Sequence, residues 1–180
     1  MQPDIDVMKV ADSYLDKAKK LLARDGCLEP VAFLLLPNGE KEIVALGQFH
    51  GDADKAAKFR MLHERAQQSD ADVLIEICDA YFRDYRENPQ ELIDRLQHGG
   101  PSLRHDPKAH EAIFMMVCVR EGGSEMVTLP YTRCPEGKIV FAAPKYASRE
   151  FPDADLEHLG LVVPRWITPR HKGHPFRGQA

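Results

Sequence analysis

The residues best suited to chemistry lie in the segment His50-Gly51-Asp52-Ala53-Asp54. An imidazole and two carboxylates at alternate positions can supply nitrogen and oxygen ligands to one divalent cation. With Glu76 as general base, this set would suit a metal-dependent hydrolase acting on phosphoester-type bonds. The same aspartates also fit a structural role, because carboxylates at a strand-to-helix junction cap the helix and offset its dipole. We favour the structural interpretation.

Glu76 is the one charged residue among the apolar residues 73–78 of the expected strand 71–78. Its carboxylate is therefore either desolvated or directed into a water-filled cleft. If a strand over residues 43–46 lies beside this run, Gln48, His50 and Glu76 meet at one edge of the sheet. A structural hydrogen-bond partnership is again the interpretation we favour.

An acidic and aromatic segment follows the same run and could form a binding groove. Aromatic side chains that leave a sheet either line a cleft or pin the following loop onto the core. The sequence leaves both alternatives open. The residues concerned are Asp79, Tyr81, Phe82, Asp84 and Tyr85.

The end of the chain, residues 164–180, is rich in Pro, Arg, His and Gly. Residues 158–180 hold four basic residues and no acidic one, so the rest of the chain has 20 basic against 28 acidic residues, a net charge of −8. Cations with aromatic residues can bind phosphates and stack on bases, but an acidic body repels the same polyanion. We favour an arm that packs on the sheet or reaches a second subunit. Its expected contact residues are Arg165, Trp166, Arg170, Lys172 and Arg177.

These candidates must be positioned by helices and strands that the apolar pattern predicts. Apolar residues spaced by three and four indicate helices over residues 4–25 and 52–69, the first ended by Gly26. Asn38-Gly39 between apolar runs indicates a hairpin, because both residues tolerate a positive φ. Alternation over residues 71–78 indicates a largely buried strand. The remaining expected elements are a short helix capped by Asn88-Pro89 and strands over residues 112–119, 126–131 and 139–143.

This element order predicts an α+β fold with a single mixed, mostly antiparallel sheet of about six strands and helices mainly on one face. We expect one domain over residues 1–163, with a helical and loop insertion at 84–110 and a basic C-terminal tail at 164–180.

The strand end Ile75-Glu76-Ile77-Cys78-Asp79-Ala80-Tyr81 resembles a group of uncharacterised bacterial proteins in which a comparable strand ends in an acidic residue, alanine and an aromatic residue. The order helix, strand, strand, helix, strand is also similar to that of roadblock and longin-type scaffolds. That second resemblance implies a dimeric platform for protein partners. The first implies no known activity.

Composition and absent motifs narrow the function classes. The four cysteines are too widely spaced for a paired zinc signature and fit reduced, structural thiols. No apolar run is long enough to span a bilayer, so we expect a cytoplasmic protein without membrane contact. The sequence contains no glycine-rich nucleotide loop, serine-hydrolase elbow or zincin motif, and we expect no cofactor.

We therefore expect a non-catalytic scaffold that binds a protein partner, in the first place a second copy of itself as a homodimer. The metal-dependent hydrolase is the alternative, and nucleic-acid binding through the tail is a weaker one.

Overall fold

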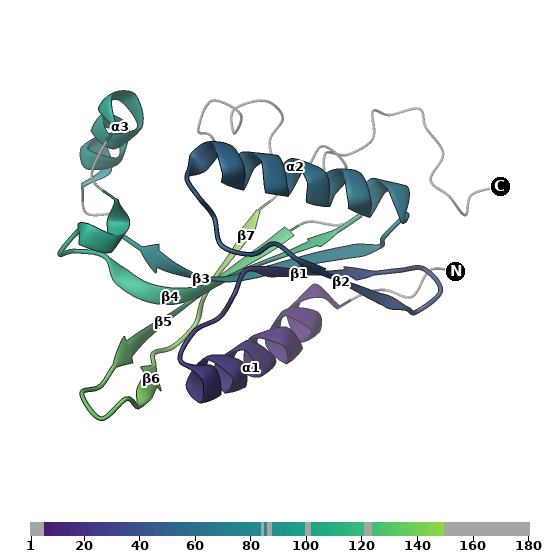
Figure 1. Cartoon of the computed structure of the whole chain (residues 1–180), viewed down its shortest axis with the longest axis horizontal. Coiled ribbons are helices and arrows are strands. Elements are labelled where there is room, and N and C mark those ends of the chain that lie inside the picture. The colour runs from purple at the N-terminus through teal and green to yellow at the C-terminus, as the bar shows by residue number, and fades with distance from the viewer. Residues whose placement is uncertain (1–5, 84, 86–87, 100–101, 121–123, 150–180) are drawn as a thin grey trace.

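The computed structural model of the chain describes residues 6–83, 85, 88–99, 102–120 and 124–149. Figure 1 shows three helices around one strongly twisted sheet. In chain order the elements are α1 (Val7–Asp25), β1 (Val31–Leu35), β2 (Lys41–Ala45), α2 (Asp52–Gln68), β3 (Val73–Phe82), α3 (Pro89–His98), the short 3-10 helix η1 (Leu103–His105), β4 (His110–Val119), β5 (Ser124–Arg133), β6 (Ile139–Phe141) and β7 (Lys145–Arg149).

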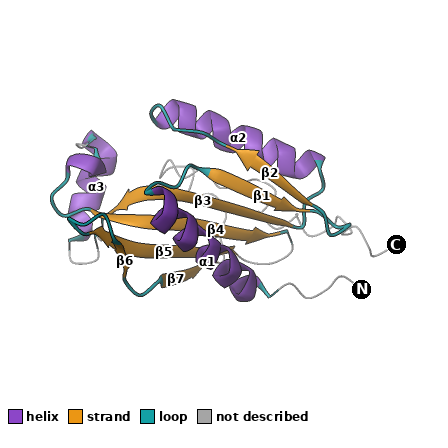
Figure 2. Ribbon diagram, turned by 60° about the horizontal axis from the view of Figure 1, so that its bottom comes forward, coloured by secondary structure: helices purple, strands orange, loops and turns teal. Residues whose placement is uncertain are grey.

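The strands follow the order β2-β1-β3-β4-β5-β6, and β7 pairs with the other half of β5. Neighbouring strands are antiparallel in every pairing between described residues. Figure 2 shows β2 at one edge of the sheet and β6 with β7 at the other. The predicted α+β fold with a single, mostly antiparallel sheet is confirmed.

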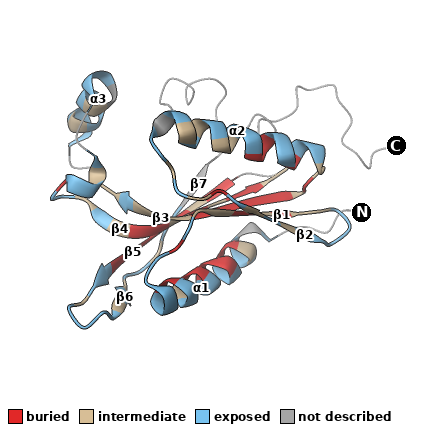
Figure 3. Cartoon of the chain, viewed as in Figure 1, coloured by how far each residue is buried: buried red, intermediate tan, exposed pale blue. Residues whose placement is uncertain are grey.

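The helices lie on both faces of the sheet, which corrects the expectation that they lie mainly on one. Helix α1 packs on the face that carries Ile75, Ile113 and Val127. Helix α2 packs through Leu62 and Ala66 on the opposite face. In Figures 1 and 3 the two helices enclose the sheet, and their buried residues face it. A strand such as β3, which is apolar on both sides, needs this cover on both faces.

Local sequence explains the boundaries of α1. The Asp6 side chain accepts a hydrogen bond from the backbone N–H of Lys9 at 3.1 Å, as an N-cap does. Gly26 ends the helix at φ 73°, and its N–H bonds to the Leu22 carbonyl. The predicted first helix and its glycine stop are therefore confirmed.

The first hairpin forms where predicted, but with a different turn. The Gly39 N–H donates to the Leu36 carbonyl at 2.9 Å, and Gly39 alone takes a positive φ, 84°. Asn38 instead uses its side-chain oxygen to accept the N–H of Glu40 at 3.0 Å. The connection is a turn over residues 36–39, with Pro37 at its second position and a bulge at Gly39, rather than a two-residue turn with positive φ at both positions.

Three other elements differ from the sequence prediction. Strand β3 continues to Phe82, beyond the expected end at Cys78. Strand β7 was not predicted. Helix α3 begins at Pro89 as expected, but Asn88 makes no side-chain capping bond. Helix α3 and η1 together fill the expected 84–110 insertion between β3 and β4.

Candidate functional site

The His50–Asp54 segment contains the start of α2, and the N-cap is Gly51 rather than one of the aspartates as expected, with no side-chain capping bond. The Asp54 carboxylate accepts the backbone N–H of His50 at 2.8 Å and pairs with Lys58 at 3.0 Å. The backbone N–H bond is the main cause that lowers the pKa of Asp54. His50 itself is exposed, and the Asp52 side chain lies outside the described residues. Among the side chains that are described, no three His, Cys, Asp or Glu groups gather as metal ligands would.

Glu76 is buried on the α2 face of β3. Strand β1 lies between β2 and β3, so Gln48, His50 and Glu76 do not meet at one sheet edge as expected. Instead, the Glu76 Oε1 lies 3.6 Å from the Nε2 of His63, a buried residue of α2. Neither atom has a hydrogen-bond partner. The pair joins the helix to the sheet inside an apolar layer.

The acidic and aromatic segment does not leave the sheet as expected. Asp79, Tyr81 and Phe82 stay in β3, where they pair with Ile113, Glu111 and His110 of β4. Tyr81 is exposed and Phe82 is half-buried, with the Lys145 ammonium 5.6 Å from its ring centroid. Of the five residues predicted to form a groove, Asp84 lies outside the described residues, and of the other four only Tyr85 lines the pocket described below.

Asp79 belongs to a polar cluster on the face of the sheet that α1 covers, beside the C-terminal end of that helix. The Tyr131 hydroxyl on β5 donates to Asp79 at 2.5 Å and lies 3.3 Å from Glu111. Arg133 binds Glu111 at 2.9 Å, donates to the Tyr131 hydroxyl at 3.0 Å, and reaches the Gly26 carbonyl at the end of α1 at 2.6 Å. The cluster therefore ties three strands to the helix.

Burial sets the electrostatics of this cluster. It raises the pKa of Asp79, against the opposing effects of the Tyr131 hydrogen bond and of Arg133. It also raises the pKa of Tyr131, with the bond to Asp79 acting in the same direction. A phenol with a raised pKa stays protonated at neutral pH and donates a hydrogen bond rather than acting as a base. The cluster is thus built to hold strands together.

The thiols on the opposite face of the sheet are similarly unreactive. Burial raises the pKa of Cys78 to about 11. It also raises the pKa of Cys118 well above its ordinary value. Because the thiolate is the nucleophile, neither residue supplies one at neutral pH.

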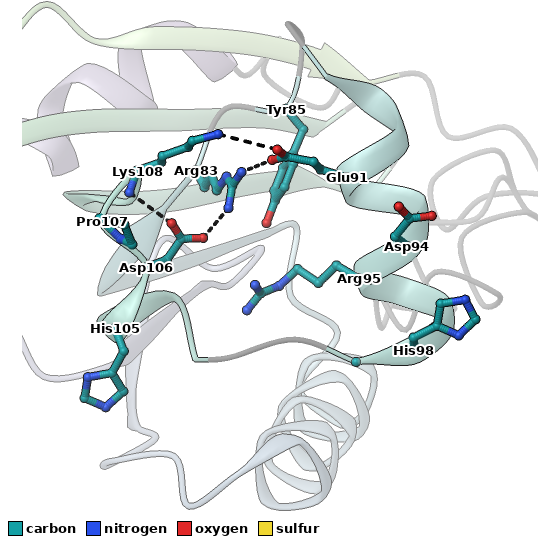
Figure 4. A pocket seen from close by; sticks show the side chains of 11 residues that line it. Arg83, Tyr85, Glu91, Asp94, Arg95, His98, His105, Asp106, Pro107 and Lys108 are labelled. Carbon is teal, nitrogen blue, oxygen red and sulfur yellow. Dashed lines mark hydrogen bonds and ion pairs between the residues drawn. The ribbon is translucent and has the colours of Figure 1, made fainter.

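A pocket of about 540 Å³ lies beyond the end of β3, in the insertion (Figure 4). Its volume is within the range of small-molecule sites. Arg83 and Tyr85, which follow β3, form one wall, α3 forms a second, and the segment after η1 forms a third. The lining side chains are mainly charged: Arg83, Glu91, Asp94, Arg95, Asp106 and Lys108.

Arg83 holds the walls of this pocket together. Its guanidinium binds Glu91 of α3 and Asp106 after η1, and it lies 4.9 Å from the centroid of the Tyr85 ring. The Lys108 ammonium is 3.4 Å from Glu91, and the Lys108 N–H donates to Asp106 at 2.9 Å. This network was not predicted from the sequence, because its members are scattered from residue 83 to residue 108 without a recognisable spacing.

The predicted tail contacts Arg165, Trp166, Arg170, Lys172 and Arg177 lie outside the described residues. Within the part of the chain that is described, no helix is both long and apolar enough to cross a bilayer.

Comparison with protein-family models, curated proteins and solved structures finds no match to this chain. The resemblances to bacterial proteins and to roadblock and longin-type scaffolds therefore stay predictions. Inferences about function rest on the geometry of the molecule.

Proposed function

We propose that the protein is a non-catalytic interaction scaffold that self-associates by joining the β2 edges of two copies. The observation that carries this proposal is the outer edge of β2 (Lys41–Ala45), which pairs with no other strand of the described residues. The opposite edge of the sheet differs, because it is divided between two strands, β6 and β7, which pair with separate halves of β5. An unpaired edge is a template for a further strand.

The hydrogen-bond pattern identifies the groups that β2 offers. Leu46 donates to the Pro30 carbonyl at 3.0 Å, and Glu40 accepts from the Leu36 N–H at 2.9 Å. Even-numbered residues of β2 therefore bond toward β1. In an antiparallel ladder the alternate residues point their N–H and C=O groups the other way. Lys41, Ile43 and Ala45 thus present their backbone outward.

This set of outward residues is self-complementary about Ile43. An antiparallel pairing centred there places Ile43 beside Ile43 of a second copy and Lys41 beside Ala45. Glu42 falls opposite Val44. No like charges face each other directly, so the pairing avoids the repulsion that usually protects edges.

Apolar side chains flank the same edge. Ile43 is 66% exposed and Met61 of α2 is 50% exposed. Arg65, one turn after Met61, binds Glu42 of β2 at 2.7 Å, so this stripe of α2 lies over β2. A second copy would cover apolar groups on both sides of the joined strands. The strand also contains no proline to block addition.

We also propose that the protein is located in the cytoplasm. The four cysteines are unpaired, as is usual in a reducing compartment such as the cytoplasm.

Light scattering after size-exclusion chromatography tests self-association over a series of micromolar concentrations. We expect wild type to shift toward a dimer as concentration rises. Ile43→Lys, which would place two like charges at the centre of the interface, should remain a monomer. Val140→Lys is the matched control, because Val140 is 49% exposed on β6 at the other edge. A monomeric wild type, or a dimer that tolerates Ile43→Lys, would refute the proposal.

A further inference from the structure

We propose that residues 156–167 of the C-terminal segment dock on their own chain, on the part of the α2 face of the sheet that α2 does not cover. This surface is separate from the β2 edge, and the contact does not depend on self-association. The proposal rests on an apolar surface formed by β3, β4 and β5, on the point where β7 ends, and on the composition of the residues that follow.

Helix α2 covers only part of its face of the sheet. Beneath it lie Leu34 of β1, Leu74 of β3 and Cys118 of β4. Among the described residues, the apolar cluster under α2 contains none from β5. Figure 2 agrees, because α2 lies along the β1 and β2 side of the sheet, away from β5 and β7. The α2 face of β5 and the adjoining part of β4 are therefore not covered by α2.

This uncovered surface is apolar. Two cross-strand rows form it: Cys78, Phe114 and Thr128 in the first, and Met116 and Met126 in the second. Alternate residues of a strand share a face, and Met116 packs against the cluster under α2, so both rows lie on the α2 face. Within the described chain, Phe114 and Met126 are half-buried and belong to neither apolar cluster. A contiguous apolar surface of this kind marks an interaction site.

The C-terminal segment begins at the edge of this surface. Strand β7 pairs with β5, and its last residue, Arg149, lies opposite Ser124. Thr128 lies further along β5, about 14 Å from Ser124 at the rise of an antiparallel strand. The chain from Arg149 to Leu156 can span up to about 25 Å when extended. Residues 156–167 are therefore within reach of the whole surface.

The composition of residues 156–167 suits an apolar surface. Seven of these twelve residues are apolar: Leu156, Leu159, Leu161, Val162, Val163, Trp166 and Ile167. The charged residues among them are Glu157 and Arg165, which balance each other. Residues 168–180 differ, because Phe176 is their only large apolar residue. Docking of residues 156–167 thus removes apolar area from water with little loss of charge hydration.

A segment of the same chain has an advantage over a separate partner. Because residues 156–167 are tethered to β7, their effective concentration at the surface is about millimolar. A separate protein of the same chemistry would need a comparable free concentration to compete. The surface is therefore filled first from within the chain.

Trp166 is the only tryptophan of the chain, so its fluorescence reports on this segment alone. Acrylamide quenching of the whole chain provides the test. We expect a Stern–Volmer constant several times smaller in the native protein than in urea, because docking shields the indole from the quencher. Phe114→Lys, which would place a charge in the docking surface, should bring the native constant close to its value in urea. Val140→Lys is the matched control, since Val140 is 49% exposed on β6, and it should leave the constant unchanged.

Three further variants keep the test decisive. Urea unfolding shows whether each variant is folded, and if Phe114→Lys is not, the milder Met126→Gln decides by raising the native constant. Val162→Asp changes the segment rather than the sheet and should raise the constant as Phe114→Lys does. Phe176→Asp lies outside residues 156–167 and should leave the constant unchanged.

Ile43→Lys separates this contact from the β2 interface, because the indole should stay shielded in the monomer. Shielding that is lost in Ile43→Lys would overturn the proposal, since the segment would then lie against the second copy. Equal quenching in the native protein and in urea would also overturn it, as would shielding that survives in a folded Phe114→Lys variant. Light scattering reports on the β2 edge independently of these outcomes.

Discussion

The Tyr131 hydroxyl on β5 donates a hydrogen bond of 2.5 Å to Asp79 on β3, and so joins two strands that are separated by β4. Backbone bonds in a sheet link only adjacent strands. This side-chain bond therefore adds a constraint across three strands, at the end of the sheet where the insertion begins.

Tyr131→Phe removes this bond and keeps the ring. We expect the free energy of unfolding to fall by about 1–3 kcal/mol, the usual effect of losing a hydrogen bond to a charged partner. Urea unfolding measures the change. The control is Tyr146→Phe, because the Tyr146 hydroxyl bonds to Asp12 at 2.8 Å at an exposed site and should contribute much less. Equal losses in the two variants would contradict a special role for Tyr131.

The two aspartates Asp79 and Asp54 should affect stability oppositely as pH changes. Burial raises the pKa of Asp79 above its usual 3.8, so its stabilising contribution is present below that pH and is lost as pH rises through the folded-state value. The backbone N–H of His50 lowers the pKa of Asp54, so its contribution is present at neutral pH and is lost on acidification.

Urea unfolding at a series of pH values from 3 to 7 measures both effects, these limits being about the range in which carboxyl groups titrate. Asp79→Asn should reduce the loss of stability on going from acid to neutral pH. Asp54→Asn should reduce the loss on going from neutral to acid pH. If the two variants change the pH profile in the same direction, the assignment of at least one environment is wrong.

Adjacent leucines of α1 give a test of how the helix packs. Leu22 is fully buried against the sheet, whereas Leu21 is 41% exposed. Leu22→Ala should lower the free energy of unfolding by about 2–5 kcal/mol, because apolar surface is no longer buried and a cavity is left. Leu21→Ala should cost clearly less, because much of its side chain already contacts water. Thermal or urea unfolding of the two variants decides, and similar losses would mean that α1 packs by another face.

The buried pair His63 and Glu76 should behave as a unit. Either substitution to leucine alone leaves the other polar group buried without its neighbour, which is strongly destabilising. The double variant removes both groups. Its decrease in the free energy of unfolding should therefore be smaller than the sum of the decreases in the two single variants, by about 0.5–3 kcal/mol. Urea unfolding of all four proteins completes the cycle, and additive losses would show that the two residues are not coupled.

The sequence alone was sufficient to predict the structure where residues close together in the chain determine it. The spacing of apolar residues and Gly26 defined α1 almost to its ends. The β1–β2 and β5–β6 hairpins each contain Pro-x-Gly, at Pro37 to Gly39 and at Pro135 to Gly137, and in both the glycine takes a positive φ and its N–H closes the turn. Proline restrains φ at the start of such a turn, and glycine permits the bulge, so these signals are local.

Sequence analysis failed where the partner of a residue lies far along the chain. The alternating apolar pattern was assigned to residues 71–78, so Asp79 and its carboxylate were predicted to lie in a segment that leaves the sheet. Strand β3 continues because Tyr131, 52 positions later, satisfies that carboxylate. The pocket was missed for a similar reason, since Arg83, Glu91 and Asp106 come together only when the insertion folds back on the end of β3.

By itself, the sequence determined most of the helices and strands, the α+β class and the fact that β3 is apolar on both sides. Only the tertiary structure decided that α1 and α2 lie on opposite faces, that β2 is left as an uncovered edge, and that the charges of the insertion enclose a pocket. The physical reason is the distance along the chain over which each interaction acts. Backbone geometry and apolar spacing act over a few residues, whereas strand order and side-chain partnership depend on contacts that form only when distant segments pack together.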